Sequence, residues 1–359
     1  MKLTSLFLAL IMALLPLLGC AEETAAPTAE ELFMQAYAAA TADPPDYAKA
    51  EEYYLAAAEL GHAGAMLNLG LAYANGDFTG GTPDFDKAKA MLMMAAALEQ
   101  SEAIYALGYY YATGAINNGV PDYAEMEKWY LKAGEMGNIN ALINLGIHYY
   151  NGQNADGKPD YVKSRTTLQK AAELGNGEAM YHLGLHYEDG TFNQDWLLEE
   201  NVPDPAKALT WYEAGWEAGS MNAGERLIVL YAIDKLDEDG NILIAADHAK
   251  LLQLVEKLCA SGTKNVNAYS WLGWFYAGNS DLNLCETDYQ KAFEAYKRGA
   301  ALGYGYCMWQ IGRMYEDGRL GMVDLIAAEA WITKAIAAGE SSPVAQEDLE
   351  RIRSLLEAQ

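Results

Sequence analysis

The stretch that decides the fold is DYAEMEKWYLKAGEMGNINALINLGIHYYNG, residues 122–152, with its near copy DYVKSRTTLQKAAELGNGEAMYHLGLHYEDG, residues 160–190. The first residues of the two stretches, Asp122 and Asp160, belong to a series with a spacing of 38 residues that begins with Asp46 and Asp84. Each of these aspartates follows a proline and precedes an aromatic residue. A fixed period of this length indicates stacked helical repeats. Such a stack offers an extended surface to a partner, whereas a globular enzyme offers a pocket.

The pattern continues with wider gaps, which gives eight units in all; the later units start at Asp204, Asp247, Asp288 and Asp324. Each aspartate is placed to cap a helix, because its side chain can accept the unpaired amides of the first turn. A large residue stands eight positions after every aspartate, and Gly stands fifteen positions after it in seven of the eight units, with Glu99 as the exception. Gly ends a helix by adopting the left-handed conformation. The first helix of each unit is therefore predicted to have roughly four turns.

A second helix is expected in each unit. Six units carry a Leu-Gly or Ile-Gly pair, and a Tyr follows within a few residues. Gly inside a helix costs about 1 kcal/mol relative to Ala, so a repeated helical Gly predicts close contact between helices. The Tyr is expected to fill the space between units. In the fifth unit Ile228 replaces this Gly, and the eighth unit has no recognisable second half.

This pattern resembles the SEL-one-like repeat, a relative of the tetratricopeptide repeat, and the resemblance covers about residues 46–340. The resemblance implies an all-α fold, a right-handed α/α solenoid of about eight helix-turn-helix repeats that acts as a protein-interaction scaffold. Residues 30–45 are interpreted as an N-terminal capping helix and residues 341–359 as a C-terminal capping helix with a polar outer face.

The N-terminus predicts export. Lys2 precedes an almost wholly apolar run from Leu3 to Leu18, which favours a signal peptide at residues 1–19. Leu17-Leu18-Gly19-Cys20 resembles a bacterial lipobox, which implies lipidation of Cys20 and a lipidated tether at residues 20–29. A plain secreted protein or an uncleaved anchor is the alternative. Because Ala21, and not Asp, follows the cysteine, we expect an outer-membrane lipoprotein of the bacterial cell envelope that faces the periplasm.

The charge of the chain limits its partners. It has 50 acidic and 24 basic residues and a net charge of -26. This argues against nucleic acid and against anionic lipid heads as partners of the general surface, so membrane association is expected through the lipid anchor only. Basic or neutral protein partners are compatible with it, and solubility alone is an equally good explanation.

Three cysteines remain after Cys20. Cys259 and Cys307 stand where other units have Ala, so they are interpreted as small buried core residues. The alternative is a disulfide that joins the sixth and seventh units. Cys285 lies in the loop between these units and is the poorer partner for Cys307.

Candidate catalytic residues are few. Ser261 and Lys264 fit a Ser-x-x-Lys pattern, but they lie where a helix should end and the companion motifs of penicillin-binding enzymes are missing. Ser261-Gly262-Thr263-Lys264 is therefore interpreted as a chance match. We expect no catalytic residue, no cofactor and no enzyme activity.

Metal sites are also not expected. His182 and His186 lie four residues apart, but a metal-binding His-Glu-x-x-His motif would need Glu at Leu183. His148 and His186 occupy matching positions in adjacent units and are interpreted as partly exposed surface residues. An acidic loop departs from the spacing of a calcium loop and is interpreted as a solvated turn; its residues are Asp234, Asp237, Asp239 and Asn241.

Two groups of residues are candidates for partner binding. The aromatic residues after the first four aspartates form a column along the face that usually holds peptides, and they are Tyr47, Phe85, Tyr123 and Tyr161. The alternative is that these rings pack between successive helices. Two long insertions, Thr191 to Pro203 and Lys235 to Ala246, break the period, and such loops often carry specificity. Trp196, with Leu197 and Leu198, is the preferred contact.

The sequence thus predicts a lipid-anchored, periplasmic, non-enzymatic scaffold or adaptor that binds a protein or peptide on the solenoid surface. One alternative is an immunity-type neutraliser of an envelope-targeted toxin, with an acidic surface that faces a basic toxin. Another is an enzyme that acts on cell-wall material or β-lactams. The identity of the partner does not follow from the residues.

Overall fold

The computed structural model describes residues 26–191, 203–237, 239–279 and 284–358. Cys20, Trp196, Leu197 and Leu198 lie outside the described residues. The first helices of the eight units are α2 (Tyr47–Glu59), α4 (Phe85–Ala97), α6 (Tyr123–Glu135), α8 (Tyr161–Glu173), α10 (Pro205–Glu217), α12 (His248–Ala260), α14 (Tyr289–Ala301) and α16 (Leu325–Ala337).

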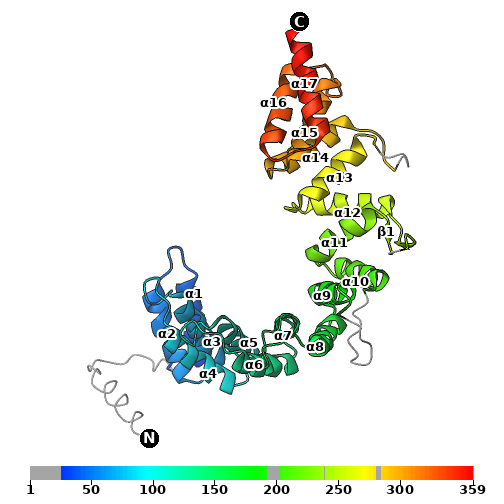
Figure 1. The fold of residues 1–359 in the computed structure, drawn as a ribbon. Coiled ribbons are helices and arrows are strands. Elements are labelled where there is room, and N and C mark those ends of the chain that lie inside the picture. The colour runs from blue at the N-terminus through cyan, green and yellow to red at the C-terminus, as the bar shows by residue number, and fades with distance from the viewer. Residues whose placement is uncertain (1–25, 192–202, 238, 280–283, 359) are drawn as a thin grey trace. The chain divides into compact units, whose positions relative to one another are not determined.

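Second helices follow seven of them, and these are α3 (Ala63–Asn75), α5 (Ser101–Thr113), α7 (Ile139–Tyr150), α9 (Gly177–Glu188), α11 (Met221–Ala232), α13 (Val266–Tyr276) and α15 (Gly305–Glu316). Helix α1 (Ala29–Ala40) precedes the first unit, and α17 (Pro343–Glu357) takes the place of the second helix in the eighth unit. The chain divides after Pro121 into two compact units, one with α1 to α5 and one with α6 to α17. Within each, every helix packs against the next in the chain (Figure 1). The predicted all-α solenoid of helix-turn-helix repeats is confirmed.

The predicted helix ends have a direct structural basis. All eight aspartates cap their helices, because each side chain accepts the backbone N–H three residues later. Such a cap is typically worth about 1 kcal/mol. The glycines that follow the first helices have positive φ values, as at Gly61 (86°) and Gly137 (84°). Glu99, the one exception to the Gly pattern, adopts the same left-handed conformation with a φ of 59°.

The Gly residues inside the second helices mark close contacts with the following unit. A Cβ added at Gly146 would lie 2.6 Å from Leu168, and one at Gly184 would lie 2.4 Å from the ring of Tyr212. Both distances are far below ordinary van der Waals contact. The facing residue is in each case the large residue eight positions after an aspartate. The prediction that tight helix contact explains the repeated Gly is therefore confirmed.

In the fifth unit the relative sizes of the two residues at this contact are reversed. Ile228 takes the place of the Gly, and Val255 takes the place of the large facing residue. Both side chains are buried in one hydrophobic cluster, with exposed fractions of 2% and 0%. Elsewhere in the described repeats the facing residue is Leu, Ile or Tyr. This junction therefore has a larger residue on the second helix and a smaller one on the following first helix.

The second insertion contains two short strands that the sequence pattern does not predict. Strands β1 (Lys235–Leu236) and β2 (Ile242–Ile244) pair antiparallel, and β2 contacts α10. Ile244 is buried, whereas Leu236, Ile242 and Leu243 are exposed. Ile244 thus packs into the core, and the three exposed residues give the hairpin an apolar outer surface. Among the described residues no helix is long and apolar enough to cross a membrane.

Candidate functional site

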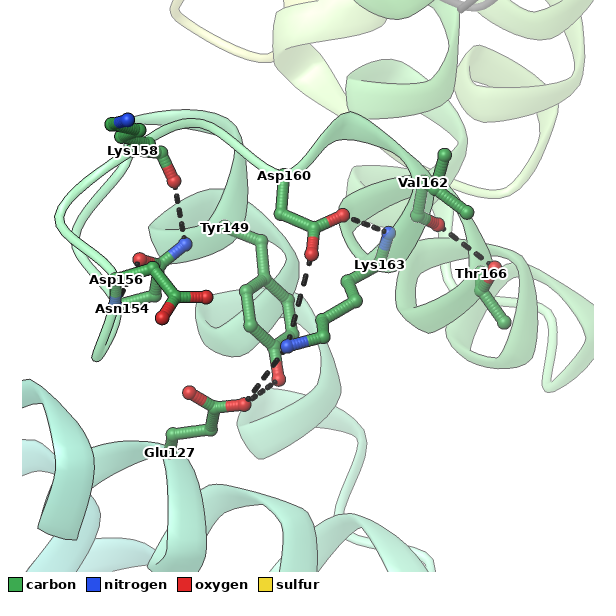
Figure 2. A network of polar contacts seen from close by, with 9 residues as sticks. All are labelled: Glu127, Tyr149, Asn154, Asp156, Lys158, Asp160, Val162, Lys163 and Thr166. Atoms are coloured by element: carbon green, nitrogen blue, oxygen red, sulfur yellow. Dashed lines mark hydrogen bonds and ion pairs between the residues drawn. The ribbon is translucent and has the colours of Figure 1, made fainter. Parts of the chain in front are cut away.

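The residues that repeat most strictly form a polar clamp at the junction between units, which Figure 2 shows between α7 and α8. Asp160 donates its backbone N–H to the carbonyl oxygen of Tyr149 at 2.9 Å. The hydroxyl of Tyr149 donates to Glu127 on α6 at 2.6 Å. The Lys163 ammonium lies 5.1 Å from the centroid of the Tyr149 ring and 3.5 Å from the Glu127 carboxylate. Three helices are joined through these four residues.

The clamp recurs along the chain. Burial raises the pKa of Tyr149, and its hydrogen bond to Glu127 raises it further, so the phenol stays a neutral donor. A Lys over the ring of a Tyr is also found at Tyr73 and Lys87, Tyr187 and Lys207, Tyr231 and Lys250, and Tyr276 and Lys291. A cation over an aromatic face contributes about 0.5–1 kcal/mol at exposed sites. The repetition of Asp, Lys and Tyr at these junctions is therefore explained by the joining of units, without a partner.

A groove of about 620 Å³ opens between α10 and α12, over α11. Its apolar lining comes from Trp216, Leu227 and Leu254. Its polar lining comes from both first helices and from α11, and consists of Glu213, Glu217, Tyr231, Lys250, Gln253 and Lys257. Apolar surface with a few polar groups around it is the usual composition of a binding site.

The polar groups of the groove fall into two classes. Glu213 is engaged, because it accepts from Tyr231 and from Lys250, the latter at 2.6 Å. Burial acts to raise the pKa of Glu213, but these hydrogen bonds outweigh it and the net pKa is lowered. Among the described residues, Gln253 and Lys257 have no hydrogen-bond or ion-pair partner, and both are exposed. These two side chains can therefore bond to a partner without breaking a bond within the chain.

Trp216 reaches the groove because of a second size reversal in the fifth unit. The equivalent position is Ala or Gly in the first four units, for example Ala172. A Cβ added at Gly224 on α11 would lie 2.6 Å from the Trp216 ring, so Gly224 makes the space for the indole. The repeat pattern does not point to this groove. The signal that could have found it is a Trp at a small-residue position, paired with a Gly eight residues later.

The aromatic column predicted from sequence lies partly against the second helices. Tyr47 is 40% exposed, and the other three rings are half-buried. The nearest aromatic neighbours are Phe78 for Tyr47 (6.3 Å), Tyr110 for Phe85 (6.2 Å), His148 for Tyr123 (6.2 Å) and Tyr150 for Tyr161 (5.4 Å). This is the geometry of the alternative in which the rings pack between helices. Their contact with a partner stays a prediction.

His186 is not a surface residue, so that prediction is wrong. It is fully buried between Ser164 and Thr191. Ser164 donates to the carbonyl oxygen of Gly146 at 2.7 Å and therefore accepts from Nε2 of His186 at 2.8 Å. The hydroxyl of Thr191 lies 2.9 Å from Nδ1 of His186 and 3.2 Å from the backbone carbonyl oxygen of His186, and it faces both. The imidazole is buried because both of its nitrogens find partners in the core.

Burial lowers the pKa of His186 to about 4, and the positive charge of Arg165 and the nearby His182 contribute to the shift. The ring is thus neutral at physiological pH. No group of three or more His, Cys, Asp or Glu side chains in the described parts of the chain is arranged to hold a metal ion. Ser164 and His186 are hydrogen-bonded to each other but inaccessible to a substrate, so they serve packing.

The other chemical candidates also have structural roles. Ser261 donates to the carbonyl oxygen of Leu258 at 2.8 Å at the end of α12. In the acidic loop, the Asp237 carboxylate accepts from the backbone of Asp239 at 3.0 Å and of Asn241 at 2.7 Å, which closes the turn between β1 and β2. Ser261 and Asp237 therefore both stabilise the local backbone, the first at a helix end and the second in a turn.

The described cysteines are free thiols. Cys259 and Cys307 are buried, as expected for small core residues, and burial raises the pKa of each thiol to about 12. Cys285 is partly exposed. Cys259 and Cys307 form no disulfide, so the alternative of a bridge between the sixth and seventh units is wrong.

The family model of the Sel1 repeat, which is the SEL-one-like repeat, matches this chain seven times, at residues 37–62, 63–99, 101–138, 139–176, 177–220, 266–304 and 305–340. The long gap between the fifth and sixth matches, 221–265, contains Ile228, the hairpin and α12. The seven matches together span well over half of the chain.

Two solved structures and one curated protein are similar. A Sel1 repeat protein from Oxalobacter formigenes is 25% identical, with a TM-score of 0.61 over 90% of this chain and 87% of that chain. The protective antigen c5321 of uropathogenic Escherichia coli is 22% identical, with a TM-score of 0.48 over 91% of this chain and 72% of that one. Chitin synthase regulatory factor 3 of Schizosaccharomyces pombe is 28% identical over 135 residues, which are 37% of this chain and 14% of that protein. The chain therefore spans about a seventh of the length of that curated relative.

Proposed function

Because this chain belongs to the Sel1 repeat family, we propose that it is a non-enzymatic adaptor that binds a peptide segment of a partner protein in the groove between α10 and α12. The observation that supports the proposal is the large Trp216 over the small Gly224, which places the indole in the groove beside Gln253 and Lys257. Trp is among the residues most enriched at the energetic centres of interfaces.

The composition of the groove indicates the kind of segment that fits. An apolar side chain of the partner would lie against Trp216, Leu227 and Leu254. An acidic or carbonyl group beside it would bond to Lys257 or Gln253. Glu213 and Lys250 form an ion pair with each other, so they line the groove but add little net charge to it.

The location of the adaptor is part of the proposal. Lipidation of Cys20 would hold the solenoid at the outer membrane, facing the periplasm. The motif around Cys20 supports this placement, together with the acidic charge of the chain, which disfavours direct binding to anionic lipid. Cell fractionation after metabolic labelling with palmitate tests it: the native chain is expected in the membrane fraction with label, and a Cys20→Ser chain without label.

Photo-crosslinking in living cells tests the groove. A benzoylphenylalanine at Gln253 is expected to capture a specific protein, whereas the same residue at Thr166, the exposed matching position of the fourth unit, is expected to capture none. Lys257→Glu should abolish capture from Gln253 at unchanged abundance of the chain. Equal capture from both positions would contradict the proposed groove.

The captured protein would also distinguish the two interaction hypotheses. A basic toxin that kills cells lacking this chain would favour a neutraliser. An envelope protein whose assembly depends on the chain would favour the adaptor.

A further inference from the structure

Tyr296 on α14 is an exception among the buried tyrosines of the first helices. Its equivalent Tyr54 accepts a hydrogen bond from the side chain of Asn68 on the second helix, at 3.0 Å. In the seventh unit the residue that corresponds to Asn68 is Gln310, which bonds to Tyr306 instead. The hydroxyl of Tyr296 is buried and has no hydrogen-bond partner among the described residues. A buried hydroxyl without a partner is destabilising, so its presence calls for an explanation.

Tyr296 lines a cavity of about 280 Å³ in the seventh unit, separate from the groove at α10 and α12. The lining of the cavity combines aromatic side chains, Trp274, Tyr306 and Trp309, with two cationic ones, Arg313 and Arg319. Two of the seven arginines of a chain with a net charge of -26 therefore face one small cavity. The volume suits a single amino-acid residue or a small organic acid rather than a long chain.

The two guanidinium groups keep donors for a ligand. Arg313 lies 5.2 Å from the centroid of the Trp309 ring, and its nearest carboxylate, Asp348, is 4.0 Å away. That carboxylate is already bound by Arg351 at 2.6 Å. Arg319 pairs with Asp317 at 3.0 Å through one nitrogen. Since a guanidinium carries five N–H donors in a planar fork that matches a carboxylate, both arginines retain free donors.

We propose that this cavity binds a carboxylate carried on an aromatic or aliphatic group, with the carboxylate held by Arg313 and Arg319 and the apolar part against Trp274 and Trp309. The hydroxyl of Tyr296 completes the site as a further donor to the carboxylate. Burial raises the pKa of this phenol, and the positive charges of Arg319 and Arg313 oppose part of the shift. The phenol is therefore neutral and able to donate at physiological pH. Aromatic walls favour such a ligand over inorganic phosphate, which has no apolar part.

Two sources could supply this chemistry, a free small acid or the carboxyl terminus of a peptide. Calorimetric titration of the purified chain distinguishes them with four probes: N-acetylphenylalanine, a pentapeptide that ends in phenylalanine, the same pentapeptide with an amidated terminus, and inorganic phosphate. At least one of the first two is expected to bind, and the amidated peptide at least about tenfold more weakly than the free one, because it cannot form the charged pair. Equal binding of free and amidated peptide, or tighter binding of inorganic phosphate, would overturn the proposal, as would no binding of any probe.

Tyr296→Phe is the sharpest variant. Removing a hydroxyl that has no partner is expected to leave the melting temperature unchanged or raise it, while affinity for the carboxylate falls several-fold. Tyr54→Phe is the matched control: it removes a bonded hydroxyl far along the chain, so it should lower the melting temperature and leave affinity unchanged. Arg319→Gln should reduce affinity about tenfold. Retention of full affinity by both Tyr296→Phe and Arg319→Gln would show that these residues do not form the site.

Discussion

At the scale of single residues, the aspartate that opens most units has two roles at once. Its side chain caps its own helix, and in six units its backbone N–H bonds to the Tyr near the end of the preceding second helix, as Asp204 does with Tyr187 at 2.8 Å. Its position is fixed from both sides, which explains why Asp and Tyr repeat while many surface positions vary. The buried set of Ser164, His186 and Thr191 belongs to a single junction among the described repeats and replaces apolar packing there with hydrogen bonds.

The burial of His186 predicts a pH dependence of stability. Its pKa is about 4 in the folded chain, and a histidine in an unfolded chain titrates near 6.5. Between these values the unfolded chain binds the additional proton, so the free energy of unfolding falls as the pH drops from about 6.5 to about 4. The contribution is on the order of 1–3 kcal/mol. Thermal unfolding followed across this range should show a smaller loss for His186→Gln than for the native chain.

Ser164→Ala is the matched control for this measurement. It removes a hydrogen bond to the ring but leaves the imidazole buried, so stability should fall at every pH while its dependence on pH is kept. An equal acid sensitivity of the native chain and His186→Gln would show that other groups are responsible.

At the scale of elements, the solenoid is built by fitting a large side chain of one helix against a small one of the next. Most junctions place Gly on the second helix and Leu, Ile or Tyr on the following first helix. The fifth unit reverses sizes twice, with Ile228 opposite Val255 and with Trp216 over Gly224. The helices keep the same packing order through both reversals, since the sum of the two volumes at a contact matters more than which helix carries the larger residue.

The reversal predicts an energetic coupling between Ile228 and Val255. Ile228→Gly should cost about 3–5 kcal/mol, through a cavity and a Gly inside a helix. Val255→Leu alone should cost about 1 kcal/mol or more by overpacking. Together they recreate the Gly-to-Leu contact of the other units, so urea unfolding should show a double variant more stable than the sum predicts, by about 1 kcal/mol or more. Ile228→Gly with Val229→Leu, which adds a methylene at an exposed position, should be additive; additivity of the first pair as well would disprove the coupling.

At the scale of the whole molecule, each helix contacts its neighbours in the chain within its own compact unit, so the stability of that unit is a sum of local junctions. Such an arrangement needs an end that covers the last apolar face. Helix α17 supplies it in the second compact unit, where Leu349 and Ile352 pack on Ala328 and Ile332. Asp348 is buried there and accepts from the Trp309 indole at 2.9 Å, which ties the cap to the preceding unit.

Removal of residues 341–359 is therefore expected to expose the apolar face of α16. Loss of Leu349 and Ile352 alone removes about 1.5–3 kcal/mol of burial each. Calorimetry should show a lower melting temperature, and light scattering should show self-association. Removal of residues 357–359, which leaves the buried residues in place, is the control and should change neither. A truncated chain that stays monomeric with an unchanged melting temperature would show that α17 does not act as a cap.

What the sequence by itself determined is everything that depends on local chemistry and on period: the eight helix-capping aspartates, the glycines that end helices, and the helical glycines that demand close contact. These follow because capping and left-handed turns involve residues near one another in the chain. The tertiary structure alone decided which side chains meet across units. It buried His186 instead of exposing it, turned Trp216 into a groove, left the Tyr296 hydroxyl without a partner and brought Arg313 and Arg319 to one cavity. Those outcomes depend on the sizes of residues facing each other from different helices, and a period in one chain does not specify that pairing.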